Sequence, residues 1–501
     1  MRYFLILFFS FLLLRFCPAL QAQNHSAFRV LPYLNGSESG AFILTWWSET
    51  AGTSTFRLED AEGNVLREEN ISGIFFPKLG YTPAEKAQQL PGGLRPEDWL
   101  LRDSNYRYRI QLPPLTPDAT YTYRVTLGGS TFSASFQSPP DKDNWQKITF
   151  MALADAETEP LGRVLRREWE VGALAPGSAR PELSDSNWAR TFGTATLPGN
   201  IPTLRYPLTE TEGYSENIRI MRSRKPHFIL MPGDLVQGGG YQPGWDEFFR
   251  HNAGAFDQLL TTTPLFPAIG NWENFGGTLN NGYGFNGLGA FNPVVGRQKF
   301  EAYFPLPQAK DKEESRAYYR IDYGPITVLT LDSSNGIPED LRSNYSEESR
   351  LRGRDFTGPG TDTQANFTQE EFVAQGGKGL EPFNVGSAQW EWAAEHLAAA
   401  EEAGQLIFVQ FHHAPFSSGE HGLPMNHVLS SGQGGTPMQV YHPLFEAHGV
   451  IAVFSGHSEL FERSFVQENP GSRGVHYYDV GVAGDGLRGE RKESLVLVRH
   501  P

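Results

Sequence analysis

The N-terminal part of the chain alternates apolar and polar residues over short segments. Apolar side chains recur at every second position in GAFILTWWSE (residues 40–49) and STFRLED (54–60), which is typical of strands that bury one face. The segment NYRYRIQLPPLTPDATYTYRVTLGG (105–129) shows this pattern twice, with a proline-rich turn between the two halves. Residues 27–137 are therefore predicted to form a small all-β sandwich.

The pattern changes after SPPDKDNW (138–145), which has the composition of a linker. Short apolar runs then recur, each ending in polar residues: ITFMALADAE, HFILMPGD, PLFPAIGN, ITVLTLD, LIFVQFHH and IAVFSGH. Helical patterns lie between some of these runs, at residues 244–260 and 387–403. Buried strands alternating with helices predict a layered α/β domain over residues 146–501.

The polar residues that end these runs are the first candidates for chemistry, because such sheets bind ligands beyond the carboxyl ends of their strands. Those ends carry Asp155, Asp234, Asn271, His413 and His457. Each of them alone is common in turns or as a hydrogen-bonded core residue. Their succession along the chain, D-x-E, GD, GNxE, HHxP and GHxE, favours one shared site.

The first 22 residues differ from the rest of the chain. Arg2 precedes a nearly continuous apolar run, which Arg15 interrupts, and the segment ends in PALQA. This pattern predicts a cleaved signal peptide at residues 1–22 and a secreted or periplasmic protein. A membrane anchor is the alternative interpretation.

Composition narrows the classes of function. The chain has 501 residues, which favours two domains, and a net charge of -15, which argues against nonspecific nucleic-acid binding. Cys17 is the only cysteine, so the mature protein is expected to have no disulfide and no thiolate chemistry. No later apolar run is long enough for a membrane span, and nothing in the sequence specifies an oligomeric state.

The succession of strand-end blocks resembles the metallophosphoesterase (calcineurin-like) superfamily, and within it the purple acid phosphatases. The blocks here are LADAE, GDLVQ, GNWE, HHAP and GHSELFERS. LPPLTPDATYTYRV also resembles the N-terminal domain of the larger family members. The resemblance implies a fibronectin III-like sandwich followed by an α-β-β-α sandwich that hydrolyses phosphate esters by attack of a metal-bound hydroxide.

The resemblance implies a role for each matching residue. Asp234 corresponds to the residue that bridges two metal ions, and Asp155 to the first ligand of one of them. Asn271, His413 and His457 correspond to the remaining ligands of the other ion. His413 is preferred to His412 because the family ligand lies two residues before the proline.

Several family positions are changed in this chain. Gln237 replaces the iron-binding tyrosine of purple enzymes, so a colourless protein is expected, unless Tyr241 reaches the metal instead. Glu157 and Glu459 replace two histidines of one metal site. These changes predict a carboxylate-rich half-site suited to Ca, Mn, Mg or Fe, beside a histidine-containing half-site for Zn, Mn or Fe. The alternative is that Glu157 or Glu459 faces solvent and this half-site is incomplete.

The family's catalytic histidine is also replaced. Trp272 occupies its position in GNWE, and an indole cannot supply a proton. His421 is the candidate that takes over, with His427 as the fallback, while Trp272 either stacks on the substrate or closes the pocket. Glu273 matches the family's acidic residue after that histidine. Asp332 ends a strand but matches no ligand block and is interpreted as a turn residue.

The sequence thus predicts a secreted hydrolase of small phosphate mono- or diesters that uses two divalent or mixed-valence metal ions. The two extra carboxylates should disfavour a dianionic phosphate and favour a less charged substrate such as a diester. A catalytically impaired or mononuclear binding protein of the same fold is the first alternative. An enzyme that acts on phosphonate or sulfate esters is the second.

Overall fold

The computed structural model describes most of the chain between residues 27 and 484. The described residues are 27–36, 41–87, 100–160, 168–170, 190, 194–197, 200–205, 210–274, 292–304, 316–334, 373–378, 382–419, 421–423 and 434–484. The predicted signal peptide and His427 lie outside them. No helix in these ranges combines the length and the apolar character that a membrane span requires.

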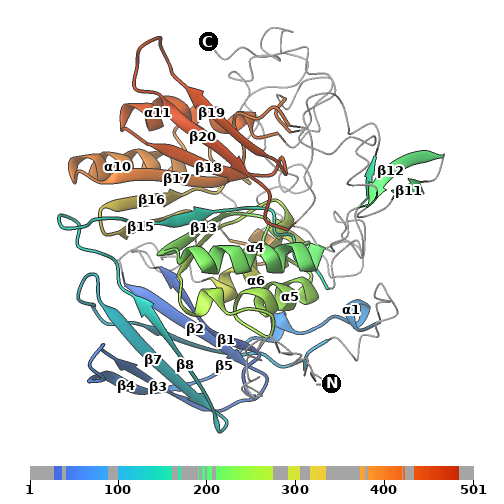
Figure 1. The fold of residues 1–501 in the computed structure, drawn as a ribbon, viewed down its shortest axis with the longest axis vertical. Coiled ribbons are helices and arrows are strands. Elements are labelled where there is room, and N and C mark those ends of the chain that lie inside the picture. Colours follow the sequence, from blue (N-terminus) through green and yellow to red (C-terminus); the bar gives the residue numbers. More distant parts are fainter. Residues whose placement is uncertain are drawn as a thin grey trace, which may run out of the picture.

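The N-terminal part is built from two facing β-sheets, consistent with the predicted all-β sandwich (blue and cyan in Figure 1). One contains β1 (Val30–Gly36), β2 (Phe42–Ser48), β5 (Ile74–Phe75) and β6 (Tyr106–Gln111). The other contains β3 (Thr53–Glu59), β4 (Val65–Ser72), β7 (Thr120–Leu127) and β8 (Ser130–Gln137). The Phe42 and Phe136 rings meet between the sheets at 5.7 Å. The likeness to a fibronectin III domain stays a prediction.

The first of these sheets continues into the C-terminal part of the chain. Its order is β5-β6-β2-β1-β14-β13-β9, with β9 (Phe150–Ala152), β13 (Phe228–Pro232) and β14 (Leu265–Ala268) at the far end. The join is the parallel pairing of β1 with β14, where Asn35 lies opposite Leu265. The Asn35 side-chain amide donates to the Leu265 carbonyl at 3.2 Å. One sheet therefore spans both predicted domains.

A second large sheet packs on the β9–β13–β14 end of the first. Its order is β15-β16-β17-β18-β20-β19, formed by β15 (Tyr319–Tyr323), β16 (Ile326–Thr330), β17 (Leu406–His413), β18 (Ala452–Gly456), β19 (Phe461–Val466) and β20 (Val475–Val480). The Phe150 ring contacts Phe408 at 5.2 Å and Phe454 at 5.7 Å, across the space between the two sheets. These contacts place apolar side chains of both sheets in one core.

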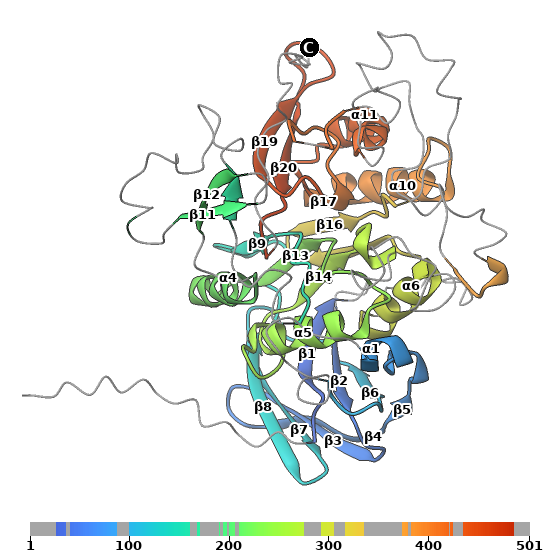
Figure 2. The ribbon, with the colours of Figure 1, turned by 90° about the vertical axis from the view of Figure 1, so that its right-hand side faces the viewer.

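Helices cover the outer faces of the two sheets (Figure 2). Helices α4 (Glu210–Arg224) and α5 (Gln242–Asn252) share a core with the first sheet, whereas α10 (Ala388–Glu402) and α11 (His442–Ala447) share one with the second. The period of two in β16 explains this division: Val328 belongs to the inter-sheet core, and Leu329 to the helix-covered core. The result is the expected α-β-β-α order of layers.

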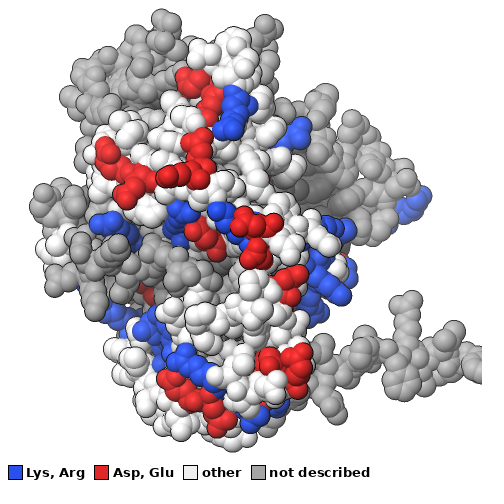
Figure 3. Space-filling model, turned by 90° about the vertical axis from the view of Figure 1, so that its left-hand side faces the viewer, with Lys and Arg blue, Asp and Glu red and all other residues white. Residues whose placement is uncertain are grey.

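The remaining elements are short or peripheral. They are α1 (Pro83–Ala87), α6 (Asn292–Tyr303), the 3-10 helices η1 (Pro77–Leu79), η4 (Leu259–Thr261), η5 (Trp272–Asn274) and η8 (Thr436–Tyr441), and a separate sheet of β10 (Glu168–Glu170), β12 (Ile201–Arg205) and β11 (Thr194–Leu197). On the face shown in Figure 3, acidic and basic side chains are interspersed.

The two predicted helices differ in accuracy. The prediction over 387–403 corresponds to α10, whose first turn is capped by the Ser387 hydroxyl accepting from the Trp390 amide. The prediction over 244–260 was too long, because α5 ends at Asn252. The apolar pattern continued into the separate turn η4, which a periodicity argument cannot distinguish from helix.

A buried ion pair ties the N-terminal sandwich to α5. The Arg29 guanidinium donates to both carboxylate oxygens of Asp246, at 2.8 and 2.7 Å, and the Tyr81 hydroxyl also bonds this carboxylate. Nearby, the backbone amide of Gln242 at the start of α5 donates to the Glu85 carboxylate at 2.7 Å. The Arg29 and Asp246 side chains are almost completely buried, so neither charge has water to replace its partner.

We predict that Asp246→Ala destabilises both parts of the protein together. Removing the carboxylate leaves the buried Arg29 guanidinium with only its longer ion pair to Glu49 at 3.9 Å, and the loss costs about 3–5 kcal/mol. Urea unfolding followed by tryptophan fluorescence should show one transition at a lower midpoint. The matched control is Glu216→Ala in the exposed Glu216–Arg219 pair on α4, which should barely move the midpoint. Two separate transitions, with only one shifted, would contradict the shared sheet as a cooperative unit.

Candidate metal centre

The polar strand ends of both sheets meet in one buried place. Asp155 follows β9, Asp234 follows β13, and Asn271 follows β14 in the first sheet. His413 ends β17, and His457 follows β18 in the second sheet. All of these residues are at most 4% exposed. The tertiary structure therefore brings together the five strand-end residues that the sequence singles out.

The backbone is in an unusual conformation at these positions. Of the eight non-glycine residues with positive φ that the structure describes, five are predicted metal ligands. They are Asp155, Glu157, Asp234, His457 and Glu459, with φ values of 59°, 40°, 54°, 77° and 50°. This left-handed conformation costs about 1–3 kcal/mol per residue, and it persists where the surroundings enforce it, often at functional sites.

The loops after β9 and β13 run side by side. The Glu157 amide donates to the Asp234 carbonyl at 3.0 Å, and the Thr158 amide donates to the Leu235 carbonyl at 3.2 Å. The backbone amide of Gln237 continues this pairing by donating to the Thr158 carbonyl at 3.1 Å. The two acidic loops thus support each other through the backbone, which leaves their carboxylates for other partners.

Asp155 lies at the base of the site. Its carboxylate accepts the His457 backbone amide, at 3.1 and 2.9 Å from its two oxygens. Burial raises the pKa of the Asp155 carboxyl well above its usual range, and the neighbouring Asp234 carboxylate acts in the same direction. A cation beside these two carboxylates would reverse both effects, because it favours their charged forms.

Asp234 lies between the two sheets. One carboxylate oxygen accepts the Trp272 backbone amide at 2.8 Å, and the other lies 2.9 Å from His412 Nε2. The backbone of Trp272, rather than its partly buried indole, thus holds this carboxylate. The predicted bridging residue is within reach of groups from both halves of the site.

Four histidine rings cluster beside Asp234. The His457 ring centroid lies 4.1 Å from that of His421, 4.4 Å from that of His413 and 5.0 Å from that of His412. Burial lowers the pKa of His413 well below its usual value, and the neighbouring His412 and His421 act in the same direction. His413 Nδ1 bonds the Ser333 hydroxyl at 2.8 Å, while its Nε2 is buried with no hydrogen-bond partner. A neutral imidazole with one nitrogen anchored and the other unsatisfied has the form of a metal ligand.

His412 was not predicted to be a metal ligand, yet it lies at the centre of the site. Its Nε2 lies 2.6 Å from the Asn271 side-chain oxygen, and its Nδ1 lies 2.9 Å from the Pro232 carbonyl. Two groups of side chains among the described residues could each hold a metal ion. They are His412, His413 and His457, and Asp155, Asp234 and His412. The sequence offered a signal for His412, because two histidines stand together in HHAP. Only His413 was chosen there, because it lies two residues before the proline.

The substituted family positions also lie inside the protein. Glu157 and Glu459 are each 4% exposed, so neither projects into solvent as the alternative interpretation required. Neither belongs to the two ligand groups found among the described residues. Gln237 is fully buried, and neither polar atom of its amide has a hydrogen-bond partner there. Tyr241 is likewise buried, at the N-terminus of α5.

Glu273 holds two strand ends together. One carboxylate oxygen accepts from the amides of Gly270 at 2.7 Å and Asp234 at 3.0 Å. The other accepts from the amides of Leu235 at 2.9 Å and Val236 at 3.4 Å. Burial and the Asp234 carboxylate raise the pKa of Glu273 to about 7, whereas these backbone donors favour the charged form. The contacts thus join the GD loop to the GN loop.

A second brace contains Asp332, which the sequence analysis interpreted as a turn residue and whose carboxylate also accepts the Ser334 amide at 2.8 Å. Arg297 on α6 donates to the Asp332 carboxylate at 2.8 Å and to the Asn274 side-chain oxygen at 2.9 Å. Ser333, the next residue, receives the His413 backbone amide at 3.1 Å in addition to its bond with the ring. This buried network connects the Asn271–Asn274 turn with the end of β17.

Of the predicted catalytic residues, His421 lies beside the cluster of histidine rings. His421 is buried with its ring against His457, as a neighbour of the ligand groups.

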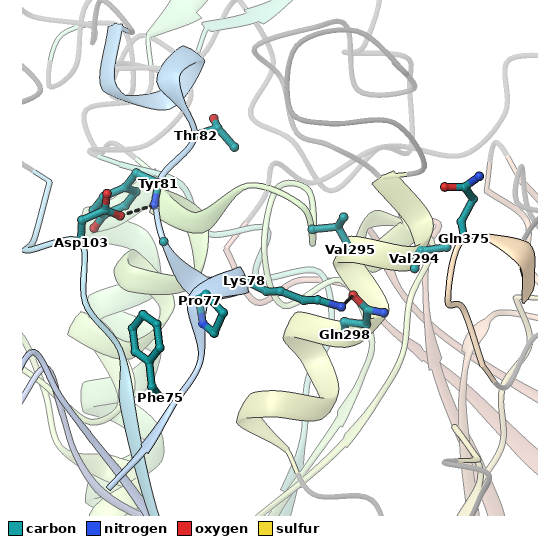
Figure 4. A pocket seen from close by; sticks show the side chains of 11 residues that line it. Phe75, Pro77, Lys78, Tyr81, Thr82, Asp103, Val294, Val295, Gln298 and Gln375 are labelled. Atoms are coloured by element: carbon teal, nitrogen blue, oxygen red, sulfur yellow. Dashed lines mark hydrogen bonds between the residues drawn. The ribbon is translucent and has the colours of Figure 1, made fainter. Parts of the chain in front are cut away.

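A pocket of about 490 Å³ lies elsewhere, between η1 and α6, where Lys78 donates to Gln298 at 2.6 Å (Figure 4). None of the candidate ligands lines that pocket. The chemistry therefore points to the buried strand ends rather than to this pocket.

We predict that Gly456→Ala weakens metal binding. A Cβ at Gly456 would overlap the Asp155 carboxylate and lie 2.5 Å from the Ala154 Cβ, so Asp155 would have to move. We expect metal affinity to fall at least tenfold and stability to fall by about 1–3 kcal/mol. Metal content after dialysis and thermal unfolding would measure both effects.

Gly213→Ala is the matched control for this substitution. A Cβ at Gly213, on α4, meets nothing within 4 Å, so this variant should keep its metal and gain slightly in stability. Full metal retention in Gly456→Ala would show that the close packing around Asp155 does not matter for binding.

Comparisons with known proteins add a family but no near relative. Residues 210–458 match the family model described as calcineurin-like phosphoesterase. The match contains Asp234, Asn271, His412, His413 and His457. It begins after Asp155 and ends one residue before Glu459. No curated protein matches this chain.

Solved structures show only distant likeness. The chain is similar to a β-glucuronidase of Bacteroides uniformis with a TM-score of 0.21 and 9% identity, covering 85% of this chain and 36% of that one. It is similar to a calcium-binding mutant of Bacteroides uniformis β-glucuronidase 2 with a TM-score of 0.24 and 10% identity, covering 87% and 41% respectively. The chain thus spans less than half the length of both proteins, and such scores support no argument about fold or function. The support for a family therefore comes from residues 210–458, whose match to the calcineurin-like phosphoesterase model supports the metallophosphoesterase superfamily.

Proposed function

We propose that this protein is a metal-dependent phosphoesterase that hydrolyses phosphate mono- or diesters at a dinuclear centre. The observation that carries the proposal is the pair of buried ligand groups, which share His412 and lie at the strand ends of two packed sheets. The calcineurin-like phosphoesterase match over 210–458 supports the same class of reaction.

The residues present suit metal ions. Asp155 and Asp234 are buried beside each other, an arrangement that needs a neighbouring positive charge. His413 offers an unsatisfied buried nitrogen, and Gln237 an unsatisfied buried amide. When bound, two metal ions acidify a water molecule and neutralise the phosphoryl oxygens of the substrate.

The side chains of this chain divide the work as follows. Asp234 stands between the halves, with Asp155, Glu157 and Glu459 on the carboxylate-rich side. Asn271, His413 and His457 form the other side. Glu273 acts by positioning, since its contacts hold the two loops that carry Asp234 and Asn271.

The leaving group needs a proton donor, and we assign this role to His421. Its ring lies against His457, at the edge of the ligand cluster. Trp272 borders the same place through its backbone bond to Asp234, and we assign its indole the role of stacking on an aromatic or sugar portion of the substrate. Negative charge on the carboxylate-rich side favours diesters over dianionic monoesters.

The proposal extends to the rest of the chain. Residues 1–22 have the pattern of a signal peptide, so the enzyme would act outside the cytoplasm. The N-terminal sandwich would be a fibronectin III-like domain that supports the catalytic part through the shared sheet.

We predict that Asp234→Asn abolishes both metal binding and turnover. Wild-type protein should carry two metal ions per chain and hydrolyse bis(p-nitrophenyl) phosphate, and the variant should lose at least 100-fold in kcat/KM. Asp60→Asn, in an exposed turn of the N-terminal sandwich, is the matched control and should behave like wild type. Parallel assays on aryl phosphate, phosphonate and sulfate esters would identify the bond that is cleaved. One metal ion or none, with no turnover of any ester, would identify a binding protein instead.

We predict that Trp272→His increases hydrolysis of p-nitrophenyl phosphate relative to the diester. An imidazole at this position can donate a proton to the leaving group, and general acid catalysis contributes about 10²–10⁴-fold. The effect should be larger for phenyl phosphate, whose leaving group is poorer. Trp272→Phe provides the control, because it removes the indole without adding an acid. Equal rates in the histidine and phenylalanine variants would show that a second proton donor, in addition to His421, does not speed the reaction.

A further inference from the structure

Two consecutive histidines of β17 reach the same site, which a regular strand does not allow. Successive side chains of a strand point to opposite faces of the sheet. The pairing of β17 with β18 shifts register between Gln410 and His413, and this irregularity lies where the doublet begins. As a result, the His412 and His413 rings lie 4.9 Å apart and nearly perpendicular, at 82°. Both contribute a nitrogen to one of the ligand groups.

The Pro232 carbonyl at the end of β13 fixes the orientation of the His412 ring. Its Nδ1 lies 2.9 Å from the Pro232 carbonyl, and a carbonyl oxygen can only accept. Nδ1 therefore carries a hydrogen, and Nε2 is the nitrogen that faces the site. A Cβ at Gly233 would lie 2.6 Å from His412 Nδ1, so the glycine of the GD loop makes room for this ring.

The Nε2 of His412 faces two oxygen atoms. It lies 2.6 Å from the Asn271 side-chain oxygen and 2.9 Å from a carboxylate oxygen of Asp234. Either an Nε2–H that donates to these oxygens or a metal ion lying among the three atoms would account for such distances, and the neighbouring His413 and His457 nitrogens favour the metal ion. Buried imidazoles held at Nδ1 by a carbonyl are the usual form of a metal-ligating histidine.

We infer that His412 is itself a ligand of the metal centre, placed at the corner that the two ligand groups share. This inference rests on the proposed metal-dependent function and adds to it. With His413 and His457, His412 gives one half-site three imidazoles and the Asn271 amide, a donor set that suits Zn²⁺. The other half-site keeps its carboxylates and suits a harder ion such as Mn²⁺ or Ca²⁺. The two halves therefore sort two different metals by donor chemistry.

The test uses full-length protein with His412→Asn and His412→Gln. The amide nitrogen of asparagine can keep the bond to the Pro232 carbonyl while the ligand nitrogen is lost, which limits damage to the fold. Circular dichroism and thermal unfolding of metal-free samples would verify that each variant is folded. The readouts are metal stoichiometry, Zn²⁺ affinity by chelator competition, and the visible spectrum of the Co²⁺-substituted protein.

We expect either folded variant to bind Zn²⁺ at least 100-fold more weakly and to change the Co²⁺ spectrum, with Mn²⁺ binding affected much less. His421→Gln is the contrast within the same cluster: its ring touches His457, but it lies in neither ligand group among the described residues. That variant should keep both metals and the wild-type Co²⁺ spectrum, even where turnover falls.

The opposite results overturn the inference. An unchanged Co²⁺ spectrum in His412→Asn together with a weaker affinity would mean that His412 only positions Asp234. Unchanged affinity and stoichiometry would exclude any role in binding. Wild-type protein that binds no metal would overturn the proposed function as well, so the two failures are distinguishable.

Discussion

The structure depends on the burial of negative charge where two β-sheets meet. Asp155 and Asp234 are almost inaccessible to water and lie beside each other, with the His412 ring close to both. Carboxylates in such a place are stable as anions only beside a compensating positive charge. The layered fold brings strand ends of both sheets to this point, so the packing of the two sheets also brings the candidate metal ligands together.

The surrounding structure holds the candidate ligands in conformations that cost conformational energy. Five candidate ligands adopt a left-handed backbone, and Gly456 leaves no room for a side chain beside Asp155. Glu273 then fixes the GD and GN loops through backbone amides, and Arg297 with Asp332 braces the turn that follows Asn271. Such pre-organisation keeps ligand atoms close together before any ion binds, which favours binding over local unfolding.

The N-terminal sandwich is continuous with the C-terminal part through one sheet and one core. β1 pairs directly with β14, the strand that leads into Asn271, and one hydrophobic cluster runs through both parts of the chain. The buried Arg29–Asp246 pair closes this junction at α5. A domain boundary drawn from the linker composition at 138–145 therefore divides the sequence but not the first sheet.

The sequence by itself determined the classes of element and most of the candidate ligands. Alternation over 27–137 and apolar runs after Lys147 predicted the strands, because side-chain periodicity follows directly from strand geometry. The polar residues at the ends of those runs were predicted to be metal ligands: Asp155, Asp234, Asn271, His413 and His457. Only the tertiary structure decided that His412 shares the site, since a register shift in β17 brings it to the side of His413. The same holds for the Arg297–Asp332 brace and for the sheet joining β1 to β14: these depend on contacts between distant residues, which no local pattern encodes.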